Sequence, residues 1–398
     1  MHATTPTARL IAALLAVLAF LLPGCTSSGA GTTATHGGCL GSPVGDVALI
    51  ASGRQNSPVP RLDGTARTVV AAALDAGHTV TIINLDGRPD LAAKFTATDL
   101  PANSSRGEAL DVITNQIAAQ LGALRADDPE VDVLAGLHLG AEHVRASRGA
   151  VLLLDSALST RPPADFTQPG VLASDSADLP RFLDHTGQGP DLHDVGIGYV
   201  NTGVVAEPQQ PLPPALVDNL RAIYTQLATD SGARCSEHLS TPTAAAAVGS
   251  GQPVSLVPIP PAIPFTAATH GFSAPVVLDA ATVHFRPDTA QLVSVPATDA
   301  VLAPIAAHLA AHPDVRVTIT GTCASGSRLG TGPDPIKLSK ERAAAIADRF
   351  IAAGINPERL TIDGVGTNFP QFVPDTDAQG RLLPGPAAQN RSVRLTFG

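Results

Sequence analysis

Tryptophan is absent from this 398-residue sequence, and aromatic residues make up only 3% of it. Lysine is also rare, and the formal net charge is −10. Residues 276–398 contain 11 acidic and 11 basic side chains, whereas residues 26–275 contain 24 acidic and 13 basic ones. A nucleic-acid-binding protein needs a basic face or stripe. Neither part of the chain has one, which disfavours nucleic acid as a partner, and we expect none.

The motifs of several enzyme classes are missing as well. The sequence has no GxSxG, no GxGxxG and no P-loop motif. Its four cysteines show no CxxC or Cys/His spacing that would bind zinc. Hard cations need charged oxygen ligands, and the segment Ala51–Ser57 lacks the leading aspartate of an Asp-x-Ser-x-Ser metal site. We therefore expect no metal, no cofactor and no catalytic residues.

The N-terminal apolar run Leu10–Leu22 has 13 residues, too few for an ordinary membrane-spanning helix. It ends in the tetrapeptide LPGC, which resembles the lipobox of bacterial lipoproteins. We expect residues 1–25 to be a lipoprotein signal peptide, Cys25 to carry lipid, palmitate included, and residues 26–38 to be a flexible tether. The alternative is an ordinary signal peptide that happens to contain a cysteine.

Export places the remaining cysteines in an oxidising compartment, where disulfides persist. Cys39 precedes the first predicted strand of the middle region and Cys235 follows its last predicted helix. A Cys39–Cys235 disulfide would tie the two ends of one domain together. Cys323 is then a buried thiol, or else it competes for one of the other two cysteines.

Residues 39–240 alternate between short apolar runs and helical patterns. This order predicts an α/β domain with a doubly wound, mainly parallel sheet, and it is similar to von Willebrand A-like or other Rossmann-like domains in element order only. Polar residues at predicted strand ends (Ser52, Asn56, Ser57, Asp155 and Ser156) leave a metal-dependent or hydrolytic middle domain as a further alternative. The predicted strands are 46–52, 78–87, 149–158 and 193–203, and the predicted helices are 65–77, 107–124, 131–147 and 213–232.

Residues 241–275 separate the middle region from a second domain. They contain seven prolines and no acidic residue, lysine or arginine. Proline removes a backbone donor and breaks helices, so we expect an extended linker that lies against a domain.

Residues 276–398 read as a two-layer α+β domain of order β-α-β-α-β-β. The predicted strands are 275–285, 315–321, 359–366 and 391–397. A helix is predicted over 300–312, and a second over 339–353 with Ser339 as its N-cap and Gly354 after its end.

This C-terminal region resembles the OmpA-like, peptidoglycan-associating domain family. The resemblance rests on Phe285 with Leu292 and on the segments HPDVRVTITG, LSKERAAAIADRFIAAGI, RLTIDGVG and NRSVRLTF in the family's order. It covers about 120 residues and implies the family's fold and its ligand, the diaminopimelate residue of the peptidoglycan stem peptide.

The resemblance implies that Arg342 pairs with the carboxylate of diaminopimelate, because Arg342 matches the arginine of the family's LSxxR motif. The family's strand-end acid, which pairs with the ammonium, is replaced by Ala324 in this chain. Asp334, in a longer loop, is a candidate replacement, with an ordinary turn aspartate as the alternative. Thr322 and Ser325 complete the candidate peptidoglycan-binding residues.

The sequence therefore predicts a non-enzymatic lipoprotein on the extracytoplasmic face of a cell membrane. Its OmpA-like domain would associate with peptidoglycan, and its α/β domain with an unidentified envelope protein. The alternative is that the OmpA-like domain has lost peptidoglycan affinity and serves as a protein-interaction module.

Overall fold

The computed structural model describes residues 40, 45–101, 104–239, 248, 252–259, 275–328 and 333–398. Residues Gly37–Gly398 form one compact unit. The predicted signal peptide, the lipidation site Cys25, the tether 26–38 and Cys39 lie outside the described residues.

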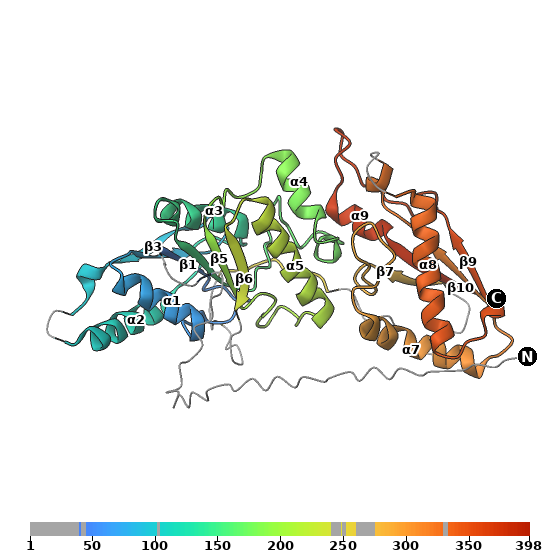
Figure 1. The fold of residues 1–398 in the computed structure, drawn as a ribbon, viewed down its shortest axis with the longest axis horizontal. Helices are drawn as coiled ribbons and strands as arrows, with labels where there is room; N and C mark the ends of the chain where they lie inside the picture. Colours follow the sequence, from blue (N-terminus) through green and yellow to red (C-terminus); the bar gives the residue numbers. More distant parts are fainter. Residues whose placement is uncertain are drawn as a thin grey trace, which may run out of the picture. The chain divides into compact units, whose positions relative to one another are not determined.

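The middle region folds around a six-stranded sheet with the order β3-β2-β1-β4-β5-β6 (Figure 1). Neighbouring strands run parallel from β2 through β6, and β3 is antiparallel to β2. Every residue of β1, β2, β4 and β5 is buried, which is typical of strands covered on both faces. The strands are β1 (Val47–Ala51), β2 (Val80–Asn84), β3 (Asp90–Phe95), β4 (Ala150–Leu154), β5 (Gly196–Val200) and β6 (Cys235–Leu239).

Two hydrophobic clusters cover the two faces of this sheet. Successive side chains of a strand point to opposite faces, and β1 divides accordingly: Ala48 and Ile50 pack with α3 and α5, whereas Leu49 packs with α1 and α2. The mixed α/β architecture predicted for the region is thus confirmed. The helices are α1 (Gly64–Asp75), α2 (Arg106–Ala123), α3 (Val133–Val144), α4 (Asp178–Thr186) and α5 (Pro214–Asp230), with short 3₁₀ helices η1 (Ala97–Asp99), η2 (Arg145–Ser147) and η3 (Val171–Ala173).

The described part of the linker, residues 252–259, lies against the α/β domain. Val257 is 2% exposed and exchanges two hydrogen bonds with the side chain of Gln209, at 2.8 and 3.0 Å. Ser255 Oγ donates to a carboxylate oxygen of Glu130 at 2.7 Å. These contacts fix this extended stretch on the domain surface.

The C-terminal region forms a second sheet with the order β7-β10-β8-β9, in which β8 and β9 are parallel and the other pairs antiparallel. Helices α7 and α8 pack on this sheet (Figure 1) through one apolar cluster that includes Ile305 and Phe350. The elements are β7 (Val276–Asp279), α7 (Val295–Ala311), β8 (Val317–Gly321), η5 (Ser325–Arg328), α8 (Pro335–Ala352), η6 (Pro357–Arg359), β9 (Leu360–Gly364), α9 (Pro384–Asn390) and β10 (Ser392–Phe397).

Several predicted boundaries were wrong. The first C-terminal strand ends at Asp279, six residues earlier than predicted, and helix α9 was not predicted. Helix α8 begins at Pro335, so its N-cap is Asp334 and not Ser339. Proline at the first helical position after a capping aspartate is a favourable start, and Ser339 Oγ instead bonds inside the fold to Ile336 O and Gly366 N.

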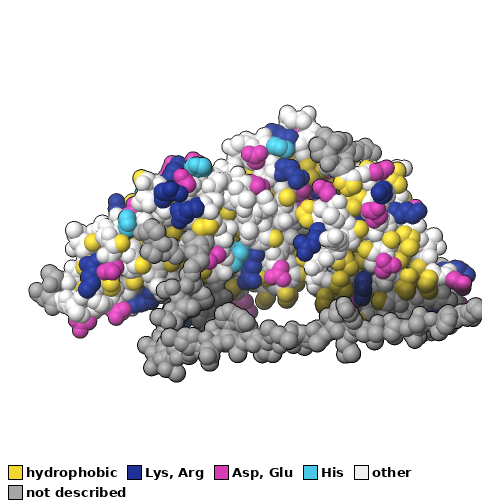
Figure 2. All heavy atoms as spheres, viewed as in Figure 1, with side chains coloured by type: hydrophobic (Ala, Val, Ile, Leu, Met, Phe, Trp, Pro, Cys, Tyr) yellow, Lys and Arg dark blue, Asp and Glu magenta, His cyan; other side chains and the backbone are white. Residues whose placement is uncertain are grey.

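Acidic and basic side chains are interspersed on the face of the molecule shown in Figure 2. Within the described ranges, no helix is long and apolar enough to cross a membrane.

A fully buried ion pair lies where β1 and β4 end. Arg54 donates to both carboxylate oxygens of Asp155, at 2.6 and 2.9 Å, and neither side chain is exposed. Asn56 and Ser156 accept two further bonds from the same guanidinium. The ends of these neighbouring strands are where a sheet of this strand order would bind a ligand, but the side chain of Arg54 fills that position.

We predict that Asp155→Ala lowers the free energy of unfolding by about 3–5 kcal/mol, because it leaves the Arg54 guanidinium buried without a counter-charge. Urea denaturation of the full chain measures the change. The double variant Arg54→Met/Asp155→Leu removes both charges and is expected to recover most of the loss. A loss below about 1 kcal/mol for the single variant would contradict this account.

Candidate functional site

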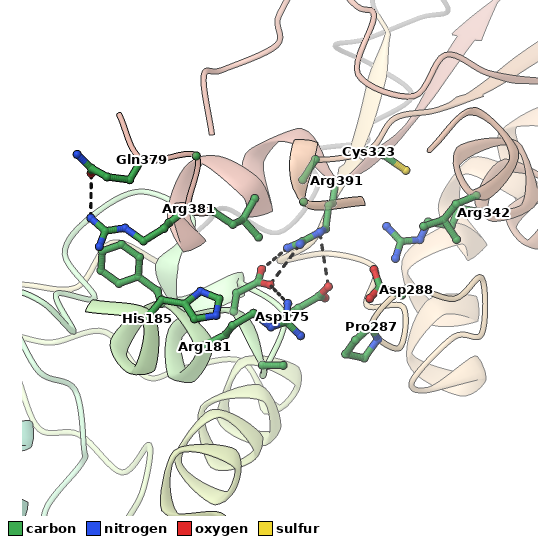
Figure 3. A pocket seen from close by; sticks show the side chains of 18 residues that line it. Asp175, Arg181, His185, Pro287, Asp288, Cys323, Arg342, Gln379, Arg381 and Arg391 are labelled. Carbon is green, nitrogen blue, oxygen red and sulfur yellow. Dashed lines mark hydrogen bonds and ion pairs between the residues drawn. The ribbon is translucent and has the colours of Figure 1, made fainter. Parts of the chain in front are cut away.

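A pocket of about 470 Å³ opens beside the end of β8 (Figure 3). Its wall is built by the end of β8, helix α8, the loop between β7 and α7, the segment 379–382 and the segment around α4 of the α/β domain. The charged side chains that line it are Asp175, Asp178, Arg181, Asp288, Arg342, Arg381 and Arg391.

Arg342 is the least exposed cation of the pocket lining. The residue is 4% exposed, and its Nε donates to the backbone carbonyl of Thr289 at 2.9 Å. The guanidinium carbon lies 5.2 Å from the centre of the Phe285 ring, a cation–π contact. Its terminal nitrogens make no hydrogen bond or ion pair with another residue that the structure describes. Burial lowers the pKa of Arg342, so a bound anion would stabilise its charge.

Arg391 also lines the pocket, but its charge is already paired. Both of its terminal nitrogens bond to the carboxylate of Asp178, and its Nε lies 3.5 Å from a carboxylate oxygen of Asp175 (Figure 3). Burial disfavours the charge, yet these two carboxylates raise the pKa of Arg391. Burial raises the pKa of Asp178, and Arg391 opposes that rise. The Arg391 guanidinium therefore joins the C-terminal region to the α4 segment and is not free to bind a ligand.

The end of β8 contributes no charge to the pocket. Cys323 and Ala324 line it and are 1% and 2% exposed. Asp288 lies on the opposite loop, on the pocket wall near Arg342 (Figure 3). The Asp288 carboxylate has no hydrogen bond with another described residue, and its charge acts on both Arg342 and Arg391. The pocket thus combines one unpaired buried cation with several carboxylates.

Part of this pocket lies in a stretch of chain that matches a known family. Residues 284–381 match the model of the OmpA family. The C-terminal domain is an OmpA-like domain. Comparison with curated proteins gives no match.

Several solved structures are similar to part of the chain. The peptidoglycan-associated lipoprotein of Burkholderia pseudomallei is 21% identical over 29% of this chain and 88% of its own, with a TM-score of 0.23. The OmpA-like domain of FopA1 from Francisella tularensis is 22% identical over 31% and 70%, with a TM-score of 0.22. The cell wall anchor of the T6SS from Pseudomonas aeruginosa is 24% identical over 31% and 78%, with a TM-score of 0.25.

Of the residues predicted for the site of the OmpA-like domain, the structure places Arg342 at the pocket. Asp334 instead caps α8, where its carboxylate accepts from Ile336 N at 2.8 Å. The hydroxyl of Thr322 donates to Asn390 O at 2.6 Å. The backbone N–H of Ser325 donates to the Asp375 carboxylate at 2.7 Å. These three residues are not part of the pocket lining.

Sequence reasoning did not single out Asp288, Asp175, Asp178 or the pocket position of Arg391. Asp288 could have been noticed, since it lies inside the Phe285–Leu292 segment that carries the family resemblance. No sequence pattern marks Asp175 and Asp178, because these residues of the α/β domain lie next to the OmpA-like domain only in the folded chain. Among the described residues, no three His, Cys, Asp or Glu side chains gather that could hold a metal ion.

Of the four cysteines, the structure describes Cys235 and Cys323. Cys323 is a free, buried thiol, and burial raises its pKa. Cys235 begins β6, whereas Cys39 lies outside the described residues, so the Cys39–Cys235 disulfide remains a prediction.

If that disulfide forms and Cys25 carries lipid, the chain denatured without reductant should contain one reactive thiol, that of Cys323. A thiol titration in guanidinium chloride measures the count, and Cys323→Ser should reduce it to zero. In native buffer, alkylation of Cys323 should be slow because the thiol is buried and protonated. Three thiols per chain would contradict the pairing.

Proposed function

We propose that this protein is a lipid-anchored protein of the bacterial cell envelope, held to the extracytoplasmic face of a membrane through Cys25. Its OmpA-like domain associates non-covalently with peptidoglycan, and its α/β domain binds a partner protein of the envelope. The observation that carries the peptidoglycan proposal is the buried Arg342, whose terminal nitrogens face the pocket without a partner among the described residues.

A planar guanidinium can donate two parallel hydrogen bonds to a carboxylate, and such charge-assisted pairs are stronger than neutral ones. Thr289 and Phe285 hold the Arg342 side chain from two directions, so little side-chain freedom remains to be lost on binding. Arg342 is the eighth residue of α8. The helix dipole falls off within the first turn, so the hydrogen bonds of the guanidinium must supply the attraction. The stem-peptide diaminopimelate offers a carboxylate of this kind.

Ala324 weakens the site relative to the pattern of the family. One missing charge-assisted bond lowers affinity by roughly 1.5–3 kcal/mol, about ten- to hundredfold. A lipid anchor offsets part of this loss, because tethering raises the effective concentration of a weak second site. A pocket with modest intrinsic affinity is therefore sufficient for attachment at a membrane surface.

Ala324 also supports the alternative that the OmpA-like domain is a protein-interaction module without peptidoglycan affinity. The enzymatic alternative for the α/β domain has less support, since Asp155 and Ser156 accept hydrogen bonds from Arg54 and the hydroxyl of Ser57 donates to Asp155.

We expect Arg342→Ala to reduce co-sedimentation of the full chain with purified peptidoglycan at least tenfold, because the variant loses the bidentate carboxylate contact. Arg349→Ala is the matched control: Arg349 lies on the same helix, pairs with Asp299 and does not line the pocket. Thermal unfolding verifies that both variants fold. No retention of the wild type would favour the interaction-module alternative, and equal retention of wild type and Arg342→Ala would contradict the role of Arg342.

A second prediction concerns the anchor. Cys25→Ala should move the protein from the detergent-rich to the aqueous phase in a detergent phase separation and abolish labelling by palmitate. The variant should still bind peptidoglycan in solution, because Arg342 is unchanged. Detergent partitioning and labelling equal to wild type would refute lipidation at Cys25.

A further inference from the structure

The α/β domain contributes two carboxylates to the pocket of the OmpA-like domain. Asp178 is the first residue of α4 and Asp175 lies just before this helix, and both line the pocket that contains Arg342 and Ala324. Polar contacts join this part of the α/β domain to the OmpA-like domain. Asp178 is bonded to Arg391 across 213 residues of sequence, and Gln389 Nε2 donates to Pro169 O at 3.1 Å.

The two carboxylates differ in how closely they are paired with Arg391. Asp178 has a 3% exposed side chain and accepts both terminal nitrogens of Arg391. Asp175 has one ion pair, to Arg391 Nε at 3.5 Å, and its side chain is 16% exposed. One guanidinium thus serves two carboxylates, and Asp178 takes the stronger contacts. Asp175 retains negative charge and some access to the pocket.

Asp175 lines the same pocket as Ala324, the residue at the position where the family has an acid. Burial raises the pKa of the Cys323 thiol and lowers that of the Arg342 guanidinium, and the charge of Asp175 adds to the first shift and opposes the second. Cys323 adjoins Ala324, the position that lacks the carboxylate implied by the family resemblance. An amino-acid group bound to Arg342 by its carboxylate would place its ammonium elsewhere in the same pocket, where a negative partner is needed.

We propose that Asp175 of the α/β domain supplies this negative partner, so that the site for a zwitterionic amino-acid group is built jointly by the two domains. This inference rests on the proposed function and adds the residue that selects for the ammonium. Other nearby acids are less suited. Asp334 caps α8, and Asp375 accepts from Ser325 N and Asn390 Nδ2. Asp288 is exposed on its loop and serves as the competing candidate in the test.

The test compares two probes, meso-diaminopimelate and pimelate, which share the seven-carbon dicarboxylate but differ in the ammonium groups. Both are titrated calorimetrically into the full chain in mild detergent. Wild type should bind diaminopimelate at least tenfold more tightly than pimelate. Asp175→Asn should remove this preference by weakening diaminopimelate alone, and Asp175→Glu should restore part of it. Arg342→Ala should weaken both probes.

Two matched variants control the result. Asp184→Asn removes an exposed carboxylate of α4 outside the pocket lining, and it should keep the preference. Asp288→Asn should change it little. A Tm for each variant verifies folding.

A preference that survives in Asp175→Asn, or that is lost equally in Asp184→Asn or in Asp288→Asn, overturns the joint site. In those cases the proposed function still stands if Arg342→Ala weakens both probes. Arg342→Ala that binds both probes like wild type would instead refute the proposed function itself.

Discussion

The ion pair between Arg391 and Asp178 is the interaction on which the pocket depends. A buried carboxylate and guanidinium lose their hydration, and only good geometry with additional hydrogen bonds repays that loss. Here both terminal nitrogens of Arg391 contact one carboxylate, and Asp175 adds a second negative charge. Because Arg391 lies directly before β10 and Asp178 begins α4, the pair brings the α4 segment against the OmpA-like domain. This contact places residues of the α4 segment in the wall of the pocket.

Three buried arginines show how the same side chain can serve structure or binding. Arg54 and Arg391 have their charge satisfied by carboxylates of the protein, so neither can take an anionic ligand without breaking the fold. Arg342 is held by one backbone carbonyl and an aromatic ring, which position the guanidinium without neutralising it. Desolvation of an unpaired cation is unfavourable, and a carboxylate from outside the protein is the partner that would relieve it.

The sequence was sufficient for some of these features and insufficient for others. The continuous apolar runs of β1, β2, β4 and β5 were predicted because both faces of these strands are buried. The edge strands β3 and β6 were missed, since DLAAKF and CSEHL are only partly buried and lack that pattern. Arg342 was predicted from the local LSxxR motif. Asp175 could not be predicted, because it lies near Arg342 only through tertiary contacts, which a local sequence pattern does not indicate.

A site shared between the domains would also couple two binding equilibria, that of the pocket for its ligand and that of the α/β domain for its partner protein. If the α4 segment supplies Asp175, any partner that binds the α/β domain and shifts this segment changes the affinity of the pocket for its ligand. Linkage requires the reverse effect to be equal: a ligand that pairs with both Arg342 and Asp175 stabilises the present contact and changes partner affinity by the same factor. Ala324 then has a physical meaning. With a carboxylate at position 324, the OmpA-like domain would hold the proposed ligand independently, whereas a carboxylate on the α/β domain would make the proposed wall attachment depend on the state of that domain.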